Sequence, residues 1–238
     1  MNDVSFPHDR RLWFYIVLPA VILNIGSLII YGGYYALKYM QPDTVAKIPQ
    51  TSVSLATYLL IFVTEWLFAL LLIAWLRRNR LTIRSLILPE NRRKPFRWGP
   101  ALLMGISINL LFLVYFLIAP MLYGDYGASY RGLPIWGQAF QLILLPLTAA
   151  FCEELIWRGH ILTQFELRGY SAWKAILLMS LSFAFIHGIF LVDKLVVTFI
   201  FGVITGWYYW KERNLIPIMV AHFILDLWGF GIFVLGFA

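Results

Sequence analysis

The chain has 238 residues, of which 61% are hydrophobic and only 13% are charged. A soluble domain carries about 25% charged residues, so this composition excludes an ordinary soluble domain and indicates a polytopic membrane protein. The formal net charge of +7 does not indicate nucleic-acid binding. The basic residues gather in short segments between apolar runs, as the positive-inside rule describes, and we expect no nucleic-acid partner.

Seven apolar runs approach the length of about 20 residues that a helix needs to cross a bilayer. They lie near residues 12–37, 53–76, 98–122, 135–157, 172–190, 195–210 and 215–236, and the sixth is the shortest. Only helices or closed barrels satisfy the backbone in lipid, and the alternation typical of barrel strands is absent. The predicted fold is therefore all-α: one integral membrane domain, 1–238, built as a bundle of about seven or eight helices. Gly202 and Gly206 indicate close helix packing in the sixth run.

The distribution of basic residues orients the bundle. Residues 77–98 hold eight Lys or Arg and are predicted to be cytoplasmic. This places the N-terminus, with Arg10 and Arg11, in the cytoplasm and the C-terminus outside, in a multi-pass protein of the plasma membrane. The first apolar run is too long for the core of a cleavable signal, so we interpret it as an uncleaved transmembrane helix.

The fourth run ends in FCEELIWRGH, residues 151–160, which places three charges within six residues. A charge at the centre of a transmembrane helix costs about 2.5–3.5 kcal/mol, so such residues are a functional hypothesis by default. Glu154 and Arg158 are four apart and are expected to pair on one helix face. Glu153 points about 100° away and is left as the less neutralised carboxylate. The alternative is a structural ion cluster at the cytoplasmic end of the helix.

Two later runs carry histidines at helical spacing. Phe183 and His187 are four apart in the fifth run, and His222 and Asp226 are four apart in the seventh. Each histidine alone is equally consistent with a hydrogen-bonding residue of the bundle. Two histidines that accompany a carboxylate pair, on three helices, indicate a site instead.

Depth in the membrane provides a test of that site. If the fourth helix continues past Gly159 and turns near Gly169, Glu153 and His187 both lie roughly 25 Å from the turn and can face each other across a helical hairpin. His222 lies nearer the cytoplasmic side. A cavity that enters from the cytoplasmic side would then unite these residues with Asp226.

Three stretches, in this order, resemble the motifs of the CPBP family, the CAAX proteases and bacteriocin-processing enzymes, also called the Abi family. EELIWR (153–158) resembles its EExxxR motif, FAFIH (183–187) its FxxxH motif and HFILD (222–226) its HxxxN/D motif. The resemblance covers roughly residues 135–230, the expected catalytic core. It implies an intramembrane endopeptidase of the glutamate-dependent kind, which hydrolyses a peptide bond of a membrane-associated protein or peptide, prenylated or not.

The resemblance also implies residue roles. Carried over by position, Glu153 is the base that activates water, His187 assists it, and His222 and Asp226 support the oxyanion. The family more often has Asn in place of Asp226, and an ionised Asp cannot donate a hydrogen bond, so Asp226 is either protonated or orients His222. Peptide hydrolysis needs such a base, an acid for the leaving amine and oxyanion donors. The remaining motif residues are expected to support the site: Glu154, Arg158 and Phe183.

The same side chains permit a metal-dependent mechanism. Glu153, His187 and His222 are the residue types that hold Zn²⁺ with an open position for water. The HExxH spacing is absent, so the sequence carries no local zinc signature. The family has been described both as metalloproteases and as metal-free enzymes. We favour the glutamate–water mechanism without a cofactor and keep zinc as the alternative.

Two functions outside proteolysis also fit a polytopic chain with buried charges. One is a non-enzymatic membrane scaffold or bacteriocin self-immunity protein, although the three motifs are intact. The other is an ion-coupled transporter or channel, which would more often show paired halves. The expected partners are the lipid bilayer and a membrane-associated peptide or protein substrate.

Overall fold

The structure is a computed structural model that describes residues 6–45, 48–89, 95–123, 132–189 and 191–235. These residues form helices and no strand, which confirms the predicted all-α bundle. The main helical segments are α1 (Leu12–Met40), α3 (Gln50–Arg78), α5 (Trp98–Tyr123), a composite helix over 135–167, α10 (Ala172–Ile186), α11 (Val192–Glu212) and α12 (Ile216–Leu235). Two four-residue helices, α2 (Pro42–Val45) and α4 (Arg84–Ile87), lie in the connections.

The composite helix carries the charged motif through the middle of the bundle. It consists of α7 (Ile135–Ala139), η2 (Phe140–Leu144), α8 (Leu145–Glu153), η3 (Glu154–Ile161) and α9 (Leu162–Leu167), of which η2 and η3 are π-helical. It therefore continues past Gly159, as the depth prediction required. Helices α3 and α12 pack against α8, and α1, α4, α10 and α11 all contact η3. The π-helical stretch begins directly at the paired carboxylates, and such stretches are frequent at functional sites.

Among the described residues, five helical segments are long and apolar enough to cross a membrane, whereas α10 and the 216–232 part of α12 are shorter apolar helices. The sixth run, predicted to be short, lies in a helix that is longer than that of the fifth run. α11 has 21 residues, but α10 has only 15, a length of about 22 Å against a hydrocarbon core of about 30 Å. Helix α10, which contains the fifth apolar run, thus ends inside the bundle.

The early end of α10 has a local cause. Gly188 adopts a φ of +114°, a backbone conformation that side-chain-bearing residues rarely adopt. Asn24 of α1 holds the turn on both sides, because its amide donates to the Phe185 carbonyl (2.8 Å) and its carbonyl oxygen accepts from the Ile189 N–H (3.0 Å). His187, the last motif residue of this helix, lies at that turn.

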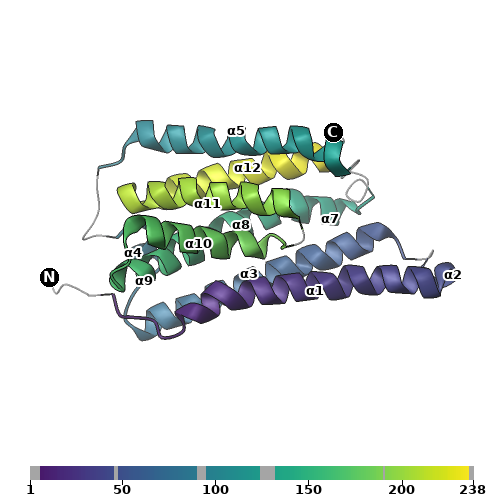
Figure 1. The fold of residues 1–238 in the computed structure, drawn as a ribbon, viewed down its shortest axis with the longest axis horizontal. Coiled ribbons are helices and arrows are strands. Elements are labelled where there is room, and N and C mark those ends of the chain that lie inside the picture. Colours follow the sequence, from purple (N-terminus) through teal and green to yellow (C-terminus); the bar gives the residue numbers. More distant parts are fainter. Residues whose placement is uncertain (1–5, 46–47, 90–94, 124–131, 190, 236–238) are drawn as a thin grey trace.

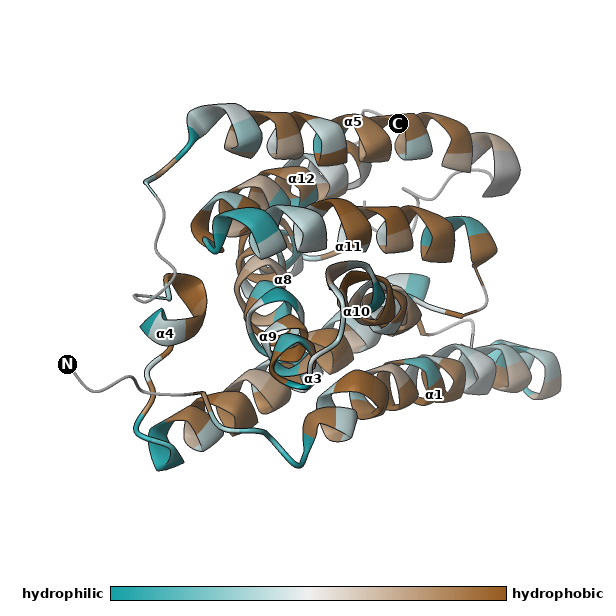
Figure 2. Ribbon diagram, turned by 60° about the vertical axis from the view of Figure 1, so that its left-hand side comes forward, coloured by the Kyte–Doolittle hydropathy of each residue, from teal (hydrophilic) through white to brown (hydrophobic). Residues whose placement is uncertain are grey.

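The two ends of the bundle differ in charge. In Figure 1, α4, α9 and the start of α1 lie at one end, and α2, α7 and the end of α12 lie at the other. We call the first end the basic end, and its described Lys and Arg residues are Arg10, Arg11, Arg77, Arg78, Arg80, Arg84, Arg97, Arg168, Lys174, Lys211 and Arg213. Figure 2 shows hydrophilic colour at the end of α3 and in the segment that leads into α1, with apolar colour along the helices.

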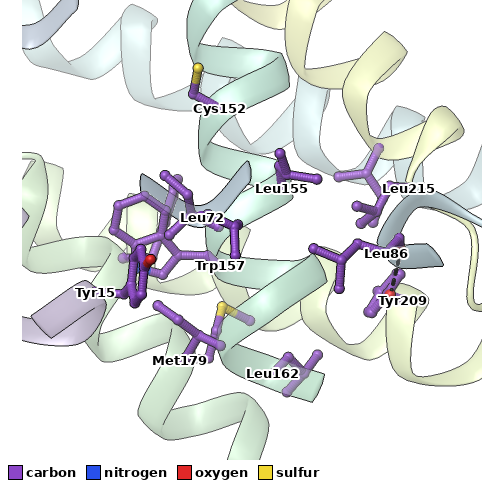
Figure 3. Close-up of a cluster of buried hydrophobic side chains, with 14 of the residues drawn as sticks. Tyr15, Leu72, Leu86, Cys152, Leu155, Trp157, Leu162, Met179, Tyr209 and Leu215 are labelled. Atoms are coloured by element: carbon purple, nitrogen blue, oxygen red, sulfur yellow. Dashed lines mark hydrogen bonds between the residues drawn. The ribbon is translucent and has the colours of Figure 1, made fainter. Parts of the chain in front are cut away.

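An apolar cluster fills the bundle between the motif helix and the basic end (Figure 3). Leu155 of η3, Leu86 of α4 and Leu215 before α12 are all at most 1% exposed. The short helix α4 is held in place by two hydrogen bonds: the Tyr209 hydroxyl donates to the Leu86 carbonyl (2.8 Å), and the Leu215 N–H donates to the Ile87 carbonyl (3.0 Å). The connection after α3 therefore packs into the bundle.

The N-terminal segment is also tied to the motif helix at this end. Asp9 is 1% exposed, and its carboxylate lies 3.1 Å from His160 Nε2. Its backbone N–H donates to Gln164, and its carbonyl accepts from Arg168. Burial alone would raise the pKa of Asp9, but the hydrogen bonds from His160 and from the Arg11 backbone outweigh it and lower the pKa below its usual value.

We expect Asp9→Asn to lower the free energy of unfolding by about 1–2 kcal/mol at pH 7, because a hydrogen-bonded buried charge is lost. The folded pKa is below the unfolded one, so this contribution is complete above about pH 4 and disappears as the pH falls through the folded value. Thermal unfolding of the solubilised protein at pH 7 and near pH 3 tests this. The wild type and Asp9→Asn should converge at low pH, whereas exposed Asp43→Asn should match the wild type at both. A gap that stays constant contradicts the assignment.

The predicted close packing of the sixth run is confirmed between α10 and α11. A Cβ placed on Gly202 would lie 2.8 Å from Ser180 Cβ and 3.0 Å from its Cα, and one on Gly206 would lie 2.6 Å from Met179 Cε. One of the Ser180 atoms that a Cβ at Gly202 would meet belongs to the backbone, so a side-chain rotation of Ser180 cannot relieve the clash. The two helices that carry His187 and Lys194 are held together by this contact.

Gly202→Ala should therefore destabilise the protein by about 1–3 kcal/mol, the usual cost of overpacking. Gly33 of α1 is a matched control, because a Cβ there meets nothing within 4 Å. Gly33→Ala should leave the stability unchanged or slightly raise it, since Ala is the better helix former. Apparent Tm values in detergent compare the two, and equal Tm values would refute the packing argument.

Candidate functional site

A buried ion cluster joins the first and third motifs. Glu154 on η3 lies 3.3 Å from Arg158 Nε through one oxygen and 2.8 Å from His222 Nδ1 of α12 through the other. Arg158 Nε also donates to the Thr205 hydroxyl of α11 at 3.0 Å. The Glu154 and Arg158 side chains are fully buried, so the pairing that their spacing predicted takes place away from water. Buried charges are tolerated when they are paired and hydrogen-bonded in this way.

The second motif contributes an aromatic face to the same cluster. The Arg158 guanidinium lies over the Phe183 ring, 4.1 Å from its centroid, and 5.0 Å from that of Phe201. Both terminal nitrogens of Arg158 lack a hydrogen-bond partner among the described residues. A cation–π contact supplies part of the missing stabilisation. Phe183 thus supports the arginine, and its ring is 4.7 Å from that of His187.

His222 is oriented by a carboxylate, but not by the one expected. Its Nδ1 faces Glu154, and its Nε2 lies 3.8 Å from Glu153 Oε2 and 3.5 Å from Asp226 Oδ2. Asp226, one turn along the same helix, therefore reaches the nitrogen that is left for chemistry. The orienting role considered for Asp226 falls geometrically to Glu154, because the neighbouring helix brings that carboxylate against Nδ1.

Glu153 has different neighbours from those expected. Among the described residues no hydrogen bond or ion pair joins Glu153 to His187. Glu153 lies instead 3.8 Å from His222 and within hydrogen-bonding range of Glu65. Glu65 lies in the middle of α3 and is 4% exposed. The sequence did carry a signal for it, since a lone carboxylate in the middle of an apolar run is a functional candidate.

His187 keeps one nitrogen for the site. Its Nδ1 lies 3.0 Å from the Phe183 carbonyl, so this nitrogen carries the proton that donates to it. In a neutral imidazole, Nε2 is then a hydrogen-bond acceptor. The backbone contact fixes the tautomer that a proton-accepting role requires.

A cavity of about 570 Å³ brings the predicted residues together. Its lining includes the polar residues Glu65, Glu153, His187, Lys194, His222 and Asp226. The rest of the wall is mostly apolar and comes from α1, α3, α5, α8, α10, α11 and α12. A mostly apolar pocket of this size with a few convergent polar groups is typical of ligand sites. Lys194 was missed because it falls in the short segment before the sixth run and was counted as a loop residue.

The composite helix, α10, α11 and most of α12 carry every motif residue described above. Residues 135–228 match the family model of Type II CAAX prenyl endopeptidase Rce1-like proteins. The match confirms the family resemblance predicted from the three motifs. Searches of curated proteins and of solved structures find no match. Glu65 lies outside the Rce1-like segment, so helix α3 adds a carboxyl group to a site that the segment otherwise supplies.

The zinc alternative was tested against the side-chain arrangement. In the part of the chain that the structure describes, no group of three or more His, Cys, Asp or Glu residues is placed to hold a metal ion. Glu153 and His222 lie 3.8 Å apart, and His187 lines the same cavity, but no ion pair joins it to either of them among the described residues. The Rce1-like site as arranged does not fit a His–His–Glu zinc centre, and the mechanism below uses no metal.

Replacing Arg158 by Met should destabilise the protein by about 3–5 kcal/mol, because it leaves a buried carboxylate without its cationic partner. The pair of Arg97 and Glu212, with 3.2 Å between the charged atoms, provides the control, because the Arg97 side chain is 61% exposed although that of Glu212 is 9% exposed. Arg97→Met should cost no more than about 1 kcal/mol. Apparent Tm values of both variants in detergent measure the difference. Comparable losses would mean that the buried pair is not a stabilising element.

Proposed function

We propose that the protein is an intramembrane endopeptidase that hydrolyses a peptide bond of a membrane-associated protein or peptide. One observation carries this proposal. The Glu153 carboxyl group is buried at a cavity large enough for a peptide segment, beside Nε2 of His222, whose other ring nitrogen is tied to Glu154. A base and an adjacent polarisable donor are the minimum that peptide hydrolysis requires.

In the proposed mechanism Glu153 accepts a proton from a water molecule as the water oxygen bonds to the peptide carbonyl carbon. The carbonyl oxygen becomes an oxyanion. His222 stabilises it through an Nε2 proton in the doubly protonated form of the ring, whose Nδ1–H donates to Glu154. Glu153 then delivers the proton to the leaving nitrogen as the carbon–nitrogen bond breaks. His187, with Nε2 as an acceptor, assists the removal of the proton from water.

The position of Asp226 suggests its part in this sequence. Its carboxylate lies 3.5 Å from His222 Nε2, so it stabilises the proton on that nitrogen when the oxyanion has not yet formed. An ionised Asp cannot itself donate to the oxyanion. We therefore assign the oxyanion contact to His222 and a supporting electrostatic role to Asp226.

The match of the Rce1-like segment supports a peptidase over the two alternatives. A scaffold has no need of an oriented imidazole beside a second buried carboxyl group, and a transporter predicts an ion path instead of a reaction. Recognition of a prenyl group is a separate question, which the choice of test peptides addresses.

The decisive experiment offers the reconstituted protein a library of membrane-proximal peptides, with and without a prenyl group, and reads cleavage by mass spectrometry. Glu153→Gln removes the base and should lower the rate by about 10²–10⁴-fold, the usual contribution of a general base. Glu212→Gln, which changes an ion pair with the 61% exposed Arg97 at the basic end and lies outside the cavity wall, should retain wild-type activity.

Each other outcome points elsewhere. Full activity in Glu153→Gln would refute the proposed base. Loss of wild-type activity on chelation, with recovery on addition of zinc, would replace the mechanism by a metal-dependent one. Ion flux that depends on Glu153, without cleavage of any peptide, would establish the transporter.

A further inference from the structure

We propose that Glu65 of α3 is a positioning residue for the proposed reaction: its carboxyl group shares one proton with that of Glu153 and thereby holds Glu153 as the base. The role of Glu153 as a base is taken from the proposed function, whereas the pairing of the two carboxyl groups follows from the structure alone. Glu65 lies outside the Rce1-like segment, residues 135–228, so the family match assigns it no role.

Helix α3 is held against α8 at the level of these two carboxyl groups. The Trp66 indole donates to the Thr148 hydroxyl at 3.2 Å, and its ring centroid lies 6.0 Å from that of Phe151. Trp66 directly follows Glu65 in α3, and Thr148 and Phe151 shortly precede Glu153 in α8. These contacts set the height of α3 on α8 and bring Glu65 level with Glu153.

The Glu65 and Glu153 carboxyl groups face each other without a competing partner. They lie within hydrogen-bonding range, and each residue is 4% exposed. Among the residues that the structure describes, Oε2 of Glu65 and Oε2 of Glu153 have no hydrogen-bond partner. Two ionised carboxylates can accept hydrogen bonds but cannot donate one, so they repel each other at this distance. One proton between them replaces the repulsion by a hydrogen bond.

The charges around the cavity balance when this proton is present. The described lining holds three carboxyl groups and two groups that carry positive charge, namely Glu65, Glu153 and Asp226 against Lys194 and the doubly protonated His222. The Glu154 carboxylate behind them is paired with Arg158. One proton on the pair of Glu65 and Glu153 therefore leaves the site neutral, which an interior with little water favours.

The position of His222 distinguishes the two carboxyl groups. Its Nε2 lies 3.8 Å from Glu153 Oε2, whereas no ion pair joins a basic residue to Glu65 in the described part of the chain. Two carboxyl groups in contact titrate as a unit, and the negative charge of the unit is most stable on the member nearer a cation. In the reactive form Glu65 is thus the protonated member, and it donates to the carboxylate of Glu153.

The proton on Glu65 stays in place during the reaction. Glu153 takes a proton from water as the water oxygen bonds to the peptide carbonyl carbon, and it passes that same proton to the leaving nitrogen as the carbon–nitrogen bond breaks. Glu65 contributes only its hydrogen bond, which holds one oxygen of Glu153 and leaves the other oxygen for water. The pair therefore begins and ends each cycle with one proton.

Two substitutions separate a positioning role from a structural one. Glu65→Gln keeps a donor for Glu153 in an amide group that does not titrate, whereas Glu65→Leu removes the donor and leaves an apolar side chain. In the cleavage assay Glu65→Leu should lower kcat by about 10–100-fold with KM unchanged, the rate equivalent of a lost hydrogen bond to a charged group. Glu65→Gln should restore kcat to near the wild-type value.

Apparent Tm values in detergent separate this effect from misfolding. Glu65→Leu should keep a Tm at or above that of the wild type, because replacing a buried polar group by an apolar one is often neutral or stabilising. An unchanged kcat in Glu65→Leu would overturn the positioning role. So would a loss of kcat in Glu65→Gln at an unchanged Tm, because the amide supplies the same hydrogen bond.

Infrared spectroscopy detects the shared proton without catalysis, because the carbonyl stretch of a protonated carboxyl group is distinct from the bands of a carboxylate. At neutral pH the spectrum of Glu65→Gln should lack protonated-carboxyl intensity that the wild type shows, and Glu212→Gln should retain it. Equal intensity in Glu65→Gln and wild type would refute the shared proton. If this intensity is lost as expected while the wild type cleaves no peptide, the carboxyl pair is supported and the proposed function fails.

Discussion

The buried carboxylate of Glu154 is the constraint on which the rest of the site depends. Its two oxygens bind Arg158 on its own helix and His222 on α12, and Arg158 in turn reaches α11 through Thr205. Buried charges of this kind have to be paired, and these pairs join three helices. Stability of the bundle and orientation of the His222 imidazole thus come from the same contacts.

Helix length sets the shape of what surrounds this cluster. The 15 residues of α10 end at the level of the site, where Asn24 of α1 and the left-handed Gly188 close the turn. The longer neighbours continue and form walls around the space that α10 leaves. On the other side α4 folds back into the bundle and packs on η3. The cavity of about 570 Å³ lies among these walls, and its place follows from where the helices end.

The helices before the Rce1-like segment complete the site. Glu65 of α3 lies against Glu153, and Asn24 of α1 holds the turn that carries His187. The three motifs did not point to these residues, since motif spacing concerns only the segment that contains it. In α3 the signal was a single carboxylate in an apolar run, and in α1 a single amide, which has several ordinary roles in a helix bundle.

The sequence by itself determined the class of fold, the run of helices and the pair of Glu154 with Arg158, because hydropathy, length and a spacing of four residues are local properties of a helix. The sequence also predicted that Glu153, His187, His222 and Asp226 line one cavity, and they do. Only the tertiary structure decided that Glu154 binds His222, that Glu65 faces Glu153 and that α1, α3 and α5 complete the wall of the cavity. Sequence spacing gives a residue's height along its own helix, whereas its partners depend on how neighbouring helices rotate and where they end.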